Sequence, residues 1–408
     1  MKYTLATLLA LCLTGAAHAQ TLNITELFGF PCTPPLSSFC VDGAQPVALI
    51  QASDGNFYGV NQTSFAAHGT TVHPAGGTVF KITAAGQVTA LYTFQRNTTT
   101  GFFDQGSNPA ALAEGTDGFL YGVASTGGPT SASAGTVFKV SKSGSGFQVL
   151  QTFCTSCTTG GFPNNIIPGT DGNLYGTTTA GGFFPSNGSC EGLGCGVVFR
   201  LTPPGTYTVL HALNGTADDS VPLGVIQASD GNLYGTTRGT GTGTIFRVLP
   251  SSHQFTTIHN FPSGVSSLNR LAQASNGLLY GASRPVSSST VTFYSSTLTG
   301  SVQSVLSLPL PSAKKFGVGP LLQASDGNLW TTSTVGGSSN LGQVLAISET
   351  GNIVHELPFN GTNGAYPVAG VIQATNGTLY GTSTDRGVDA KGNVAFGTVF
   401  TIAGLPIP

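Results

Sequence analysis

Charged side chains are scarce in this chain of 408 residues: they make up 7% of it, against about 25% in an ordinary soluble domain. The 14 Lys and Arg residues and the 16 Asp and Glu residues leave a net charge of −2. A nucleic-acid-binding protein would carry a basic stripe that neutralises phosphates, and no basic cluster here is larger than the pair Lys314-Lys315. Charge-driven disorder is excluded as well, because it combines high net charge with low hydrophobicity, whereas 39% of these residues are hydrophobic.

The composition also lacks what long helices need. Coiled coils and helical bundles are rich in Ala, Glu, Lys and Leu, whereas this chain has 58 Gly and 23 Pro, together about a fifth of its residues. The single Trp, Trp330, lies in a repeated position, so a sugar-binding platform lined by several Trp side chains is excluded. What remains is an all-β protein rich in Gly, Ser and Thr.

Long apolar runs are absent except at the N-terminus, and that one is shorter than the roughly 18 to 20 residues that cross a bilayer. Lys2 precedes an apolar stretch that ends at Leu13, and Ala17-His18-Ala19 matches the small-x-small pattern of a cleavage site. We therefore expect residues 1–19 to be a signal peptide. Residues 20–408 should form a single exported domain, secreted from the cell or located in the periplasm, with no membrane span.

Six cysteines follow the expected cleavage site in three close pairs, namely Cys32 and Cys40, Cys154 and Cys157, and Cys190 and Cys195. In an oxidising compartment such pairs favour three short disulfides, although six cysteines allow 15 connectivities. The alternative is a redox CxxC motif at residues 154–157, or a zinc site that combines this pair with the next one. We expect disulfides, no metal and no cofactor.

A hairpin signature recurs seven times along the chain. It reads Ser/Thr-Asp/Asn-Gly-x-Phe/Leu-Tyr/Trp, with a mean spacing of about 54 residues. Its glycines are Gly55, Gly118, Gly172, Gly231, Gly277, Gly327 and Gly377. An apolar run precedes each copy. Two further segments follow most copies: one like residues 77–82, and then a short one like residues 88–94 in which apolar and polar residues alternate.

Each repeat therefore predicts four strands, here named a to d. Strand a is the apolar run, Asp-Gly or Asn-Gly forms a two-residue type I′ turn, and strand b carries the Tyr. Strand c follows a variable loop, and strand d follows a short turn. Four short antiparallel strands at this period are typical of a propeller blade. The predicted fold class is all-β, a seven-bladed β-propeller of four-stranded antiparallel blades.

The last repeat has no strand d after its strand c at residues 398–403. The segment Ile24–Phe30 fits the missing pattern, so we expect this N-terminal strand to complete the last blade and to close the ring. Closure also protects exposed strand edges, which invite aggregation. An open solenoid, the alternative fold, needs neither seven complete sets of strands nor this permuted strand.

The repeat unit resembles a known family. Residues 225–237, Val-Ile-Gln-Ala-Ser-Asp-Gly-Asn-Leu-Tyr-Gly-Thr-Thr, and residues 77–82, Gly-Thr-Val-Phe-Lys-Ile, are similar to the GloVer tandem repeat of secreted bacterial proteins. The resemblance covers about residues 24–402. It implies a secreted bacterial propeller, and it implies no reaction, because the family has no established activity.

The two faces of the expected disc differ. The a–b and c–d turns share one face and are short, whereas the b–c and d–a loops share the other face and vary in length. The longest loops, with all three cysteine pairs, belong mainly to blades 1 to 3, where we expect any ligand to bind. Candidate ligand-binding side chains in these loops are Phe102, Phe103, Phe183 and Phe184. They are suited to stacking on sugar rings or holding a peptide, and the alternative is packing within their own loops.

Two charged residues depart from the repeat pattern on strand a. Glu114 takes the position at which five other blades have a Gln that we expect to bond between blades. The five are Gln51, Gln227, Gln273, Gln323 and Gln373. Arg270 lies on strand a of blade 5. Because an unpaired charge is costly near a core, we expect Glu114 and Arg270 to point into a water-filled channel, and both are candidate ligand-binding residues.

No GxSxG motif, P-loop or unpaired cysteine supplies a catalytic group. We therefore expect a non-catalytic, monomeric binding scaffold whose partner is an extracellular glycan or peptide. The alternative is a carbohydrate-active enzyme, a polysaccharide lyase or a glycosidase, with its site at the channel mouth. That alternative requires several of Glu114, His68, His73 and Arg270 to meet at one mouth of the channel.

The cysteine spacing leads to a direct test. The exported protein should have no free thiol, and mass spectrometry without reduction should find three intrachain disulfides that each join near neighbours. Because such short loops add little entropic stabilisation, reduction should loosen the loops and leave the disc folded. Two or more free thiols, or stoichiometric bound zinc, would show that the pairing is wrong.

Overall fold

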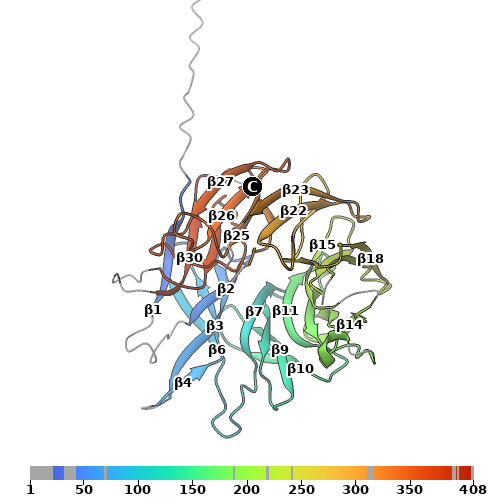
Figure 1. Ribbon diagram of the computed structural model, residues 1–408. Coiled ribbons are helices and arrows are strands. Elements are labelled where there is room, and N and C mark those ends of the chain that lie inside the picture. Colours follow the sequence, from blue (N-terminus) through green and yellow to red (C-terminus); the bar gives the residue numbers. More distant parts are fainter. Residues whose placement is uncertain are drawn as a thin grey trace, which may run out of the picture.

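The computed structural model describes residues 22–31, 43–68, 71–186, 189–216, 220–239, 242–309, 317–387, 392 and 395–405. These residues form seven antiparallel sheets that follow one another around a ring in chain order (Figure 1). The predicted seven-bladed propeller is therefore confirmed. The one helix in the described part is a short 3-10 turn, η1 (Ser189–Gly192), and no helix there is long and apolar enough to span a membrane. The predicted signal peptide and the pair Cys32 and Cys40 lie outside the described residues.

Blades 1 to 3 contain strands a to d in chain order, with strand a at the central channel. Blade 1 consists of β2 (Ala44–Gln51), β3 (Phe57–His68), β5 (Thr78–Ile82) and β6 (Val88–Thr93), and β4 (Thr71–Ala75) pairs with the end of β3. Blade 2 consists of β7 (Ser107–Glu114), β8 (Leu120–Thr126), β9 (Ser133–Val140) and β10 (Gln148–Cys154). Blade 3 consists of β11 (Gly161–Pro168), β12 (Leu174–Ala180), β13 (Val197–Thr202) and β14 (Thr206–Ala212).

Blades 4 to 7 have the same order, with shorter inner strands from blade 5 onward. Blade 4 consists of β15 (Pro222–Gln227), β16 (Leu233–Thr237), β17 (Thr244–Val248) and β18 (Phe255–Asn260). Blade 5 consists of β19 (Val265–Ser267) and β20 (Ala272–Gln273), which both pair with β21 (Leu279–Pro285), then β22 (Thr290–Ser296) and β23 (Val302–Pro309). Blade 6 consists of β24 (Leu322–Gln323), β25 (Leu329–Ser333), β26 (Gln343–Ile347) and β27 (Ile353–Pro358). Blade 7 consists of β28 (Ile372–Gln373), β29 (Leu379–Ser383), β30 (Ala395–Ile402) and the N-terminal β1 (Thr25–Pro31).

In the described part of the chain the apolar core consists of seven clusters, and each joins two adjacent blades. Successive side chains of a strand point to opposite faces of its sheet, so the Tyr of strand b and the Leu before it pack on different neighbours. Tyr234 of blade 4 packs in one cluster with Leu279 of blade 5, whereas Leu233 packs with Tyr175 of blade 3. Both faces of each blade are therefore buried, which explains why strands b and c are apolar or Thr-rich throughout.

The glycine after the strand-b Tyr has a steric role. A Cβ atom on Gly59 would lie 2.3 Å from Cζ of Phe80, because the strand-c Phe crosses the sheet directly over the glycine. The same close approach of a strand-c Phe recurs in four other blades, at Gly122, Gly176, Gly235 and Gly381. The Tyr-Gly pair and the Phe of strand c thus form one packing unit, although the Tyr and the Phe lie 12 to 24 residues apart in the chain.

The turn between strands a and b differs from the prediction. The N–H of Gly55 donates to the Ala52 carbonyl and the N–H of Ala52 to the Asn56 carbonyl, each at 2.9 Å, and only the glycine has a positive φ, +79°. This is a three-residue loop with a left-handed glycine, so the predicted two-residue type I′ turn is wrong. Asp54 keeps a negative φ, and its carboxylate accepts the N–H of Asn56 (3.2 Å) and the hydroxyl of Tyr58 (2.8 Å).

The N-terminal strand closes the ring as predicted. β1 pairs antiparallel with β30, with Thr25 opposite Thr401 and Gly29 opposite Thr398. Phe30 is completely buried and packs edge-to-face on Phe80 of blade 1, with ring centroids 5.2 Å apart. Phe30 therefore takes the position that strand-d aromatics such as Phe94 take in the other blades, and it links the last blade to the first.

Replacing Phe30 should open this closure. Phe30→Ala removes a large, fully buried side chain, and we expect a loss of about 3–5 kcal/mol in the free energy of unfolding, measured by urea titration. Thr25→Ala, on the exposed start of the same strand, is the control and should cost less than about 1 kcal/mol. A Phe30→Ala protein that unfolds at the wild-type urea concentration would contradict the role of β1 in closure.

Candidate functional site

A channel of about 370 Å³ runs through the centre of the ring, lined by strand-a residues of all seven blades. Most lining side chains are Val, Leu, Ile or Ala. The polar side chains among the lining residues are Asn164, Asn165, Asn269 and Arg270. The channel therefore combines mostly apolar side chains with exposed polar groups, the general form of a small-molecule site.

The three asparagines join blades to one another. Asn164 donates to the Pro222 carbonyl of blade 4 (2.8 Å), and Asn165 accepts the N–H of Val225 in the same blade (3.1 Å). Asn269 of blade 5 donates to the Gly319 carbonyl of blade 6 (2.8 Å). These amides have structural partners, which leaves Arg270 as the distinctive group of the channel.

A ring of side-chain amides connects the blades at the face that carries the a–b turns, which we call the turn face. In each case Oε1 of the strand-a Gln accepts a backbone N–H from the a–b turn of the preceding blade, at 2.6–3.0 Å. The five pairs are Gln51 with Thr375, Gln227 with Thr170, Gln273 with Ser229, Gln323 with Ser275, and Gln373 with Ser325. The predicted bonding between blades is confirmed, and we call these bonds latches.

Glu114 forms the latch of blade 2 with a carboxylate. It accepts the N–H and the hydroxyl of Ser53, each at 2.7 Å, and forms an ion pair with Lys142 from the c–d turn of its own blade. Partial burial alone would raise the pKa of the Glu114 carboxyl. The hydrogen bonds from Lys142 and Ser53, with the charge of Lys142, outweigh burial, so its pKa lies below the ordinary 4.5. Its position in the latch gives Glu114 a structural role, and the repeat pattern gave no signal for Lys142.

Blade 3 interrupts the ring of latches. Pro168 occupies the position of the Gln, and within the described residues the backbone N–H of Thr116 has no acceptor. A second cavity, of about 600 Å³, lies at this part of the turn face and is lined by residues that include Glu114, Thr116, Pro168 and Arg270. An alignment of the seven repeats would have revealed Pro168, so this residue was missed although the sequence contained the signal.

Arg270 belongs to both cavities, because it lines the central channel and the cavity of the turn face. Glu114 lines the cavity of the turn face together with Arg270, but it is held by Ser53 and Lys142 and is not among the residues that line the channel. This position differs from the expectation that both charged side chains point into the channel. Burial lowers the pKa of the Arg270 guanidinium. Among the described residues no side chain or carbonyl forms a hydrogen bond or an ion pair with it.

The four candidate phenylalanines lie on the opposite face, which carries the b–c and d–a loops and which we call the long-loop face. Phe102, Phe183 and Phe184 are 37%, 50% and 38% exposed, and Leu193 in the same loop as Phe183 is 43% exposed. Phe103 is partly buried, and its carbonyl accepts the N–H groups of Gly106 and Gly128 (both 2.8 Å). The Phe103 backbone is thus bonded to its own loop and to the b–c loop of blade 2, and its ring lies beside Gly76 of blade 1, whereas the other three present aromatic surface to solvent.

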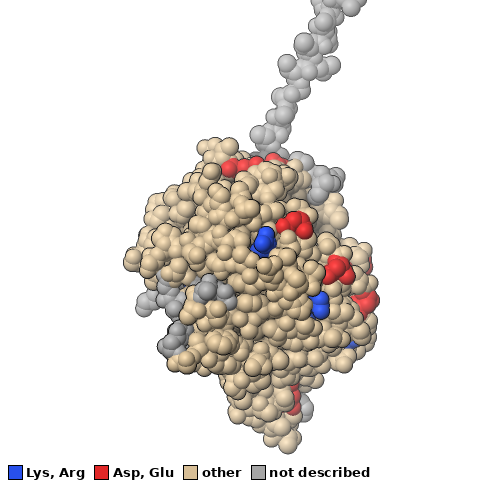
Figure 2. All heavy atoms as spheres, turned by 90° about the vertical axis from the view of Figure 1, so that its right-hand side faces the viewer, with Lys and Arg blue, Asp and Glu red and all other residues tan. Residues whose placement is uncertain are grey.

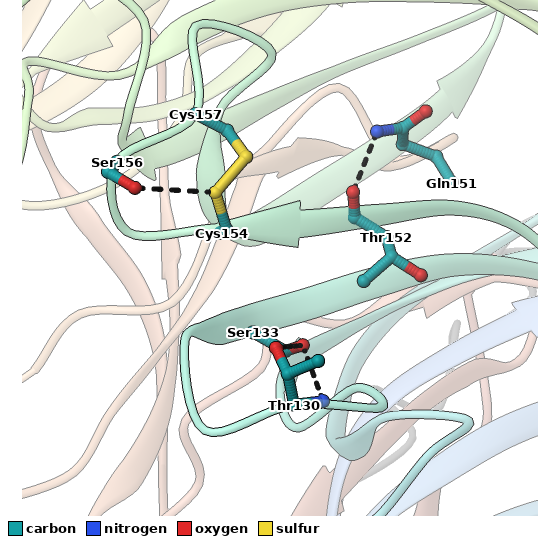
Figure 3. The surroundings of a disulfide bond; sticks show 7 residues. All are labelled: Thr130, Ser133, Gln151, Thr152, Cys154, Ser156 and Cys157. Carbon is teal, nitrogen blue, oxygen red and sulfur yellow. Dashed lines mark hydrogen bonds between the residues drawn. A yellow bond between two sulfur atoms is a disulfide. The ribbon is translucent and has the colours of Figure 1, made fainter.

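Two of the predicted disulfides are present. Cys154 is bonded to Cys157 and Cys190 to Cys195, with Cα–Cα distances of 5.1 Å in both. Figure 3 shows the first of them at the end of β10, where the hydroxyl of Ser156 approaches Sγ of Cys154 (3.7 Å). The predicted local pairing is therefore confirmed for these four cysteines. Both disulfides belong to loops of the long-loop face.

Metal ligands do not converge in the described part of the chain, where no group of three or more His, Cys, Asp and Glu side chains lies together. The side chains of His68 and His73 fall outside the described residues, and their strands, β3 and β4, pair at the long-loop end of blade 1. The view in Figure 2 shows isolated charges on a mostly uncharged surface, without a continuous basic patch.

The sequence matches one family model. The Gloeobacter/Verrucomicrobia repeat matches residues 35–189 and 185–400, most of the chain. A comparison with curated proteins found no match.

Several solved structures share the fold. One is a protein from Lactobacillus plantarum, with 14% identity, a TM-score of 0.54 and coverage of 86% of this chain and 97% of that chain. Another is a putative 6-phosphogluconolactonase from Bacteroides uniformis, with 15% identity, a TM-score of 0.52 and coverage of 81% and 94%. A third, from the mitotic checkpoint complex, has 13% identity, a TM-score of 0.53 and coverage of 98% and 99%. At these identities the likeness concerns the fold alone, which does not specify a function.

The ion pair of Glu114 makes stability depend on pH. Glu114→Gln should keep a latch to Ser53 and lose the attraction to Lys142, at a cost of about 0.5–1.5 kcal/mol at pH 7. Because the folded protein lowers the pKa of Glu114, the carboxylate stabilises fully above the ordinary 4.5 and loses its effect as the pH falls through the lowered pKa.

Urea unfolding of both proteins at pH 7 and at pH 3 measures this difference. The gap between wild type and Glu114→Gln should shrink in acid, and Glu356→Gln, at an exposed site, controls for the loss of one negative charge. A gap of the same size at both pH values would contradict the assigned ion pair.

Proposed function

We propose that this chain, which belongs to the Gloeobacter/Verrucomicrobia repeat family and carries a signal-peptide pattern, is an exported propeller. It binds a partner without catalysing a reaction. The site is the long-loop face of blades 1 to 3. The observation that carries this proposal is the location of exposed aromatic side chains. In the described part of the chain, the three exposed phenylalanines, Phe102, Phe183 and Phe184, all belong to long loops of these blades.

The loop that carries Phe183 is held in place on several sides. The N–H of Cys195 donates to the Phe183 carbonyl (3.3 Å), and the N–H of Gly182 donates to the Cys157 carbonyl (3.0 Å). Both bonds involve a disulfide-bonded cysteine, so the two disulfides support one continuous loop structure. A loop that is ordered before binding loses less conformational entropy when a partner arrives, which supports a binding role.

The loop that carries Phe102 has a similar support. The N–H of Asn97 donates to the Phe102 carbonyl (2.7 Å), and Nε of Arg96 donates to the Gly101 carbonyl (2.6 Å). The exposed ring of Phe102 is thus presented by an ordered backbone. Exposed aromatic side chains on ordered loops are typical of protein interaction surfaces.

The favoured partner is an extracellular peptide segment with apolar side chains. Phe183, Phe184 and Leu193 all expose apolar surface, and aromatic side chains such as Phe are enriched in the buried centres of protein interfaces. A glycan is the alternative partner, which would stack a sugar ring on one of the phenylalanines.

A carbohydrate-active enzyme is the alternative function, and one observation favours it: Glu114 and Arg270 line the same cavity at the turn face. Against it stands the pairing of Glu114 with Ser53 and Lys142, which holds this carboxylate in the latch. Cleavage of a polysaccharide by the purified protein, abolished in Glu114→Gln, would favour the enzyme.

The binding proposal is tested on peptide and glycan arrays with the mature protein, followed by titration of the best ligand. The double variant Phe183→Ser, Phe184→Ser should weaken binding at least tenfold and leave the melting temperature nearly unchanged, because both side chains are exposed. The matched control is Ile353→Ser, Val354→Ser, which removes an apolar pair that is 42% exposed at each residue on β27. Equal binding by both double variants would contradict the assignment of the site to the long-loop face. Binding to glycans alone on the arrays would contradict a peptide as the partner.

A further inference from the structure

We propose that the central channel is a second binding site, independent of the long-loop face, which takes a small apolar carboxylate and binds its carboxylate group with Arg270. The observation that leads to this site is a single uncompensated charge in a channel whose lining residues are mostly apolar. Arg270 is the only charged side chain among the described residues that line the channel. Within the described part of the chain it has neither a hydrogen-bond partner nor an ion-pair partner.

The positions equivalent to Arg270 in the other blades carry no long side chains. Arg270 lies seven residues before the turn glycine of its blade, and the equivalent residues of the other six blades are small or lack a long side chain. They are Ala48, Ala111, Asn165, Gly224, Pro320 and Gly370. Seven long side chains at this level would fill the channel, whereas one arginine among small neighbours leaves space for a ligand beside it.

An unpaired guanidinium in this position calls for an anion. Arginine stays protonated at every physiological pH, and it offers N–H donors in a planar fork that matches the two oxygens of a carboxylate. Arg270 is partly buried, and removing a charge from water without a partner is costly. A bound carboxylate would compensate the charge with two parallel hydrogen bonds.

The walls of the channel indicate the rest of the ligand. Ile50, Leu223, Leu268 and Ile372 are among the half-buried residues that line it, whereas its asparagines bond between blades. A sugar would find few free hydrogen-bonding side chains there. The volume of about 370 Å³ lies in the range of about 300–1,000 Å³ that is typical of small-molecule sites. The ligand class is therefore an aliphatic or aromatic monocarboxylate, of which benzoate is a representative.

The interruption of the latches provides the entrance. The cavity at the turn face shares Arg270 with the channel and lies where blade 3 has Pro168 in place of a Gln. The acidic residue that lines this cavity, Glu114, is already neutralised by Lys142. A carboxylate that enters from this side therefore meets a cation and no uncompensated negative charge.

Isothermal titration of the mature protein with benzoate tests the site, and neutral benzamide is the matched probe without the charge. We expect benzoate to bind and benzamide to bind at least tenfold more weakly. Arg270→Gln should reduce benzoate affinity at least tenfold, whereas Arg238→Gln, which removes an exposed arginine, should leave it unchanged. The Phe183→Ser, Phe184→Ser protein should bind benzoate like the wild type, which separates this site from the long-loop face.

A second variant keeps the test informative if Arg270→Gln folds poorly. Ala48→Leu narrows the channel without changing any charge, and this variant should also bind benzoate more weakly than the wild type. Benzoate that does not bind the wild type, or that binds Arg270→Gln equally well, would overturn the proposal. Sulfate or phosphate that binds Arg270 more tightly than benzoate would also overturn it, because the apolar walls would then have no role.

Discussion

Each blade of this propeller buries both faces of its sheet, and it does so against two different neighbours. Among the described residues the seven apolar clusters each join two blades, and none of these clusters lies within a single blade. Every interface therefore depends on the next around the ring. The last interface is made by an N-terminal strand, and the fully buried Phe30 gives blade 7 the same contact with blade 1 that other strand-d residues provide elsewhere.

This dependence constrains one face of the disc more than the other. At the turn face, each strand-a Gln must reach the a–b turn of the preceding blade, so the turns keep one length and one hydrogen-bonding pattern. The long-loop face has no corresponding requirement. Its loops differ in length, carry both described disulfides and expose aromatic side chains. Variation is thus tolerated where it does not disturb the contacts between blades.

The residues that depart from the repeat are the most informative about function. Glu114 replaces a Gln and remains a latch, because a carboxylate can accept the same N–H and pair with Lys142. Arg270 replaces a small residue and has no such structural use among its described neighbours, and Pro168 removes a latch beside it. Structures that share this fold have unrelated roles, so such departures carry more weight than the fold itself.

The sequence by itself determined the number of blades, their strands, the closing strand and the role of the five Gln residues, because these depend on local patterns that recur along the chain. The prediction for the a–b turn was wrong, because the chain forms a three-residue loop in which Asp54 accepts hydrogen bonds from Asn56 and Tyr58. Only the tertiary structure decided which side chains meet. It paired Glu114 with Lys142, exposed Phe102 while packing Phe103, and set Arg270 among small residues of six other blades. Closing the ring brings distant residues together, and a repeat pattern contains no information about what lies across the channel.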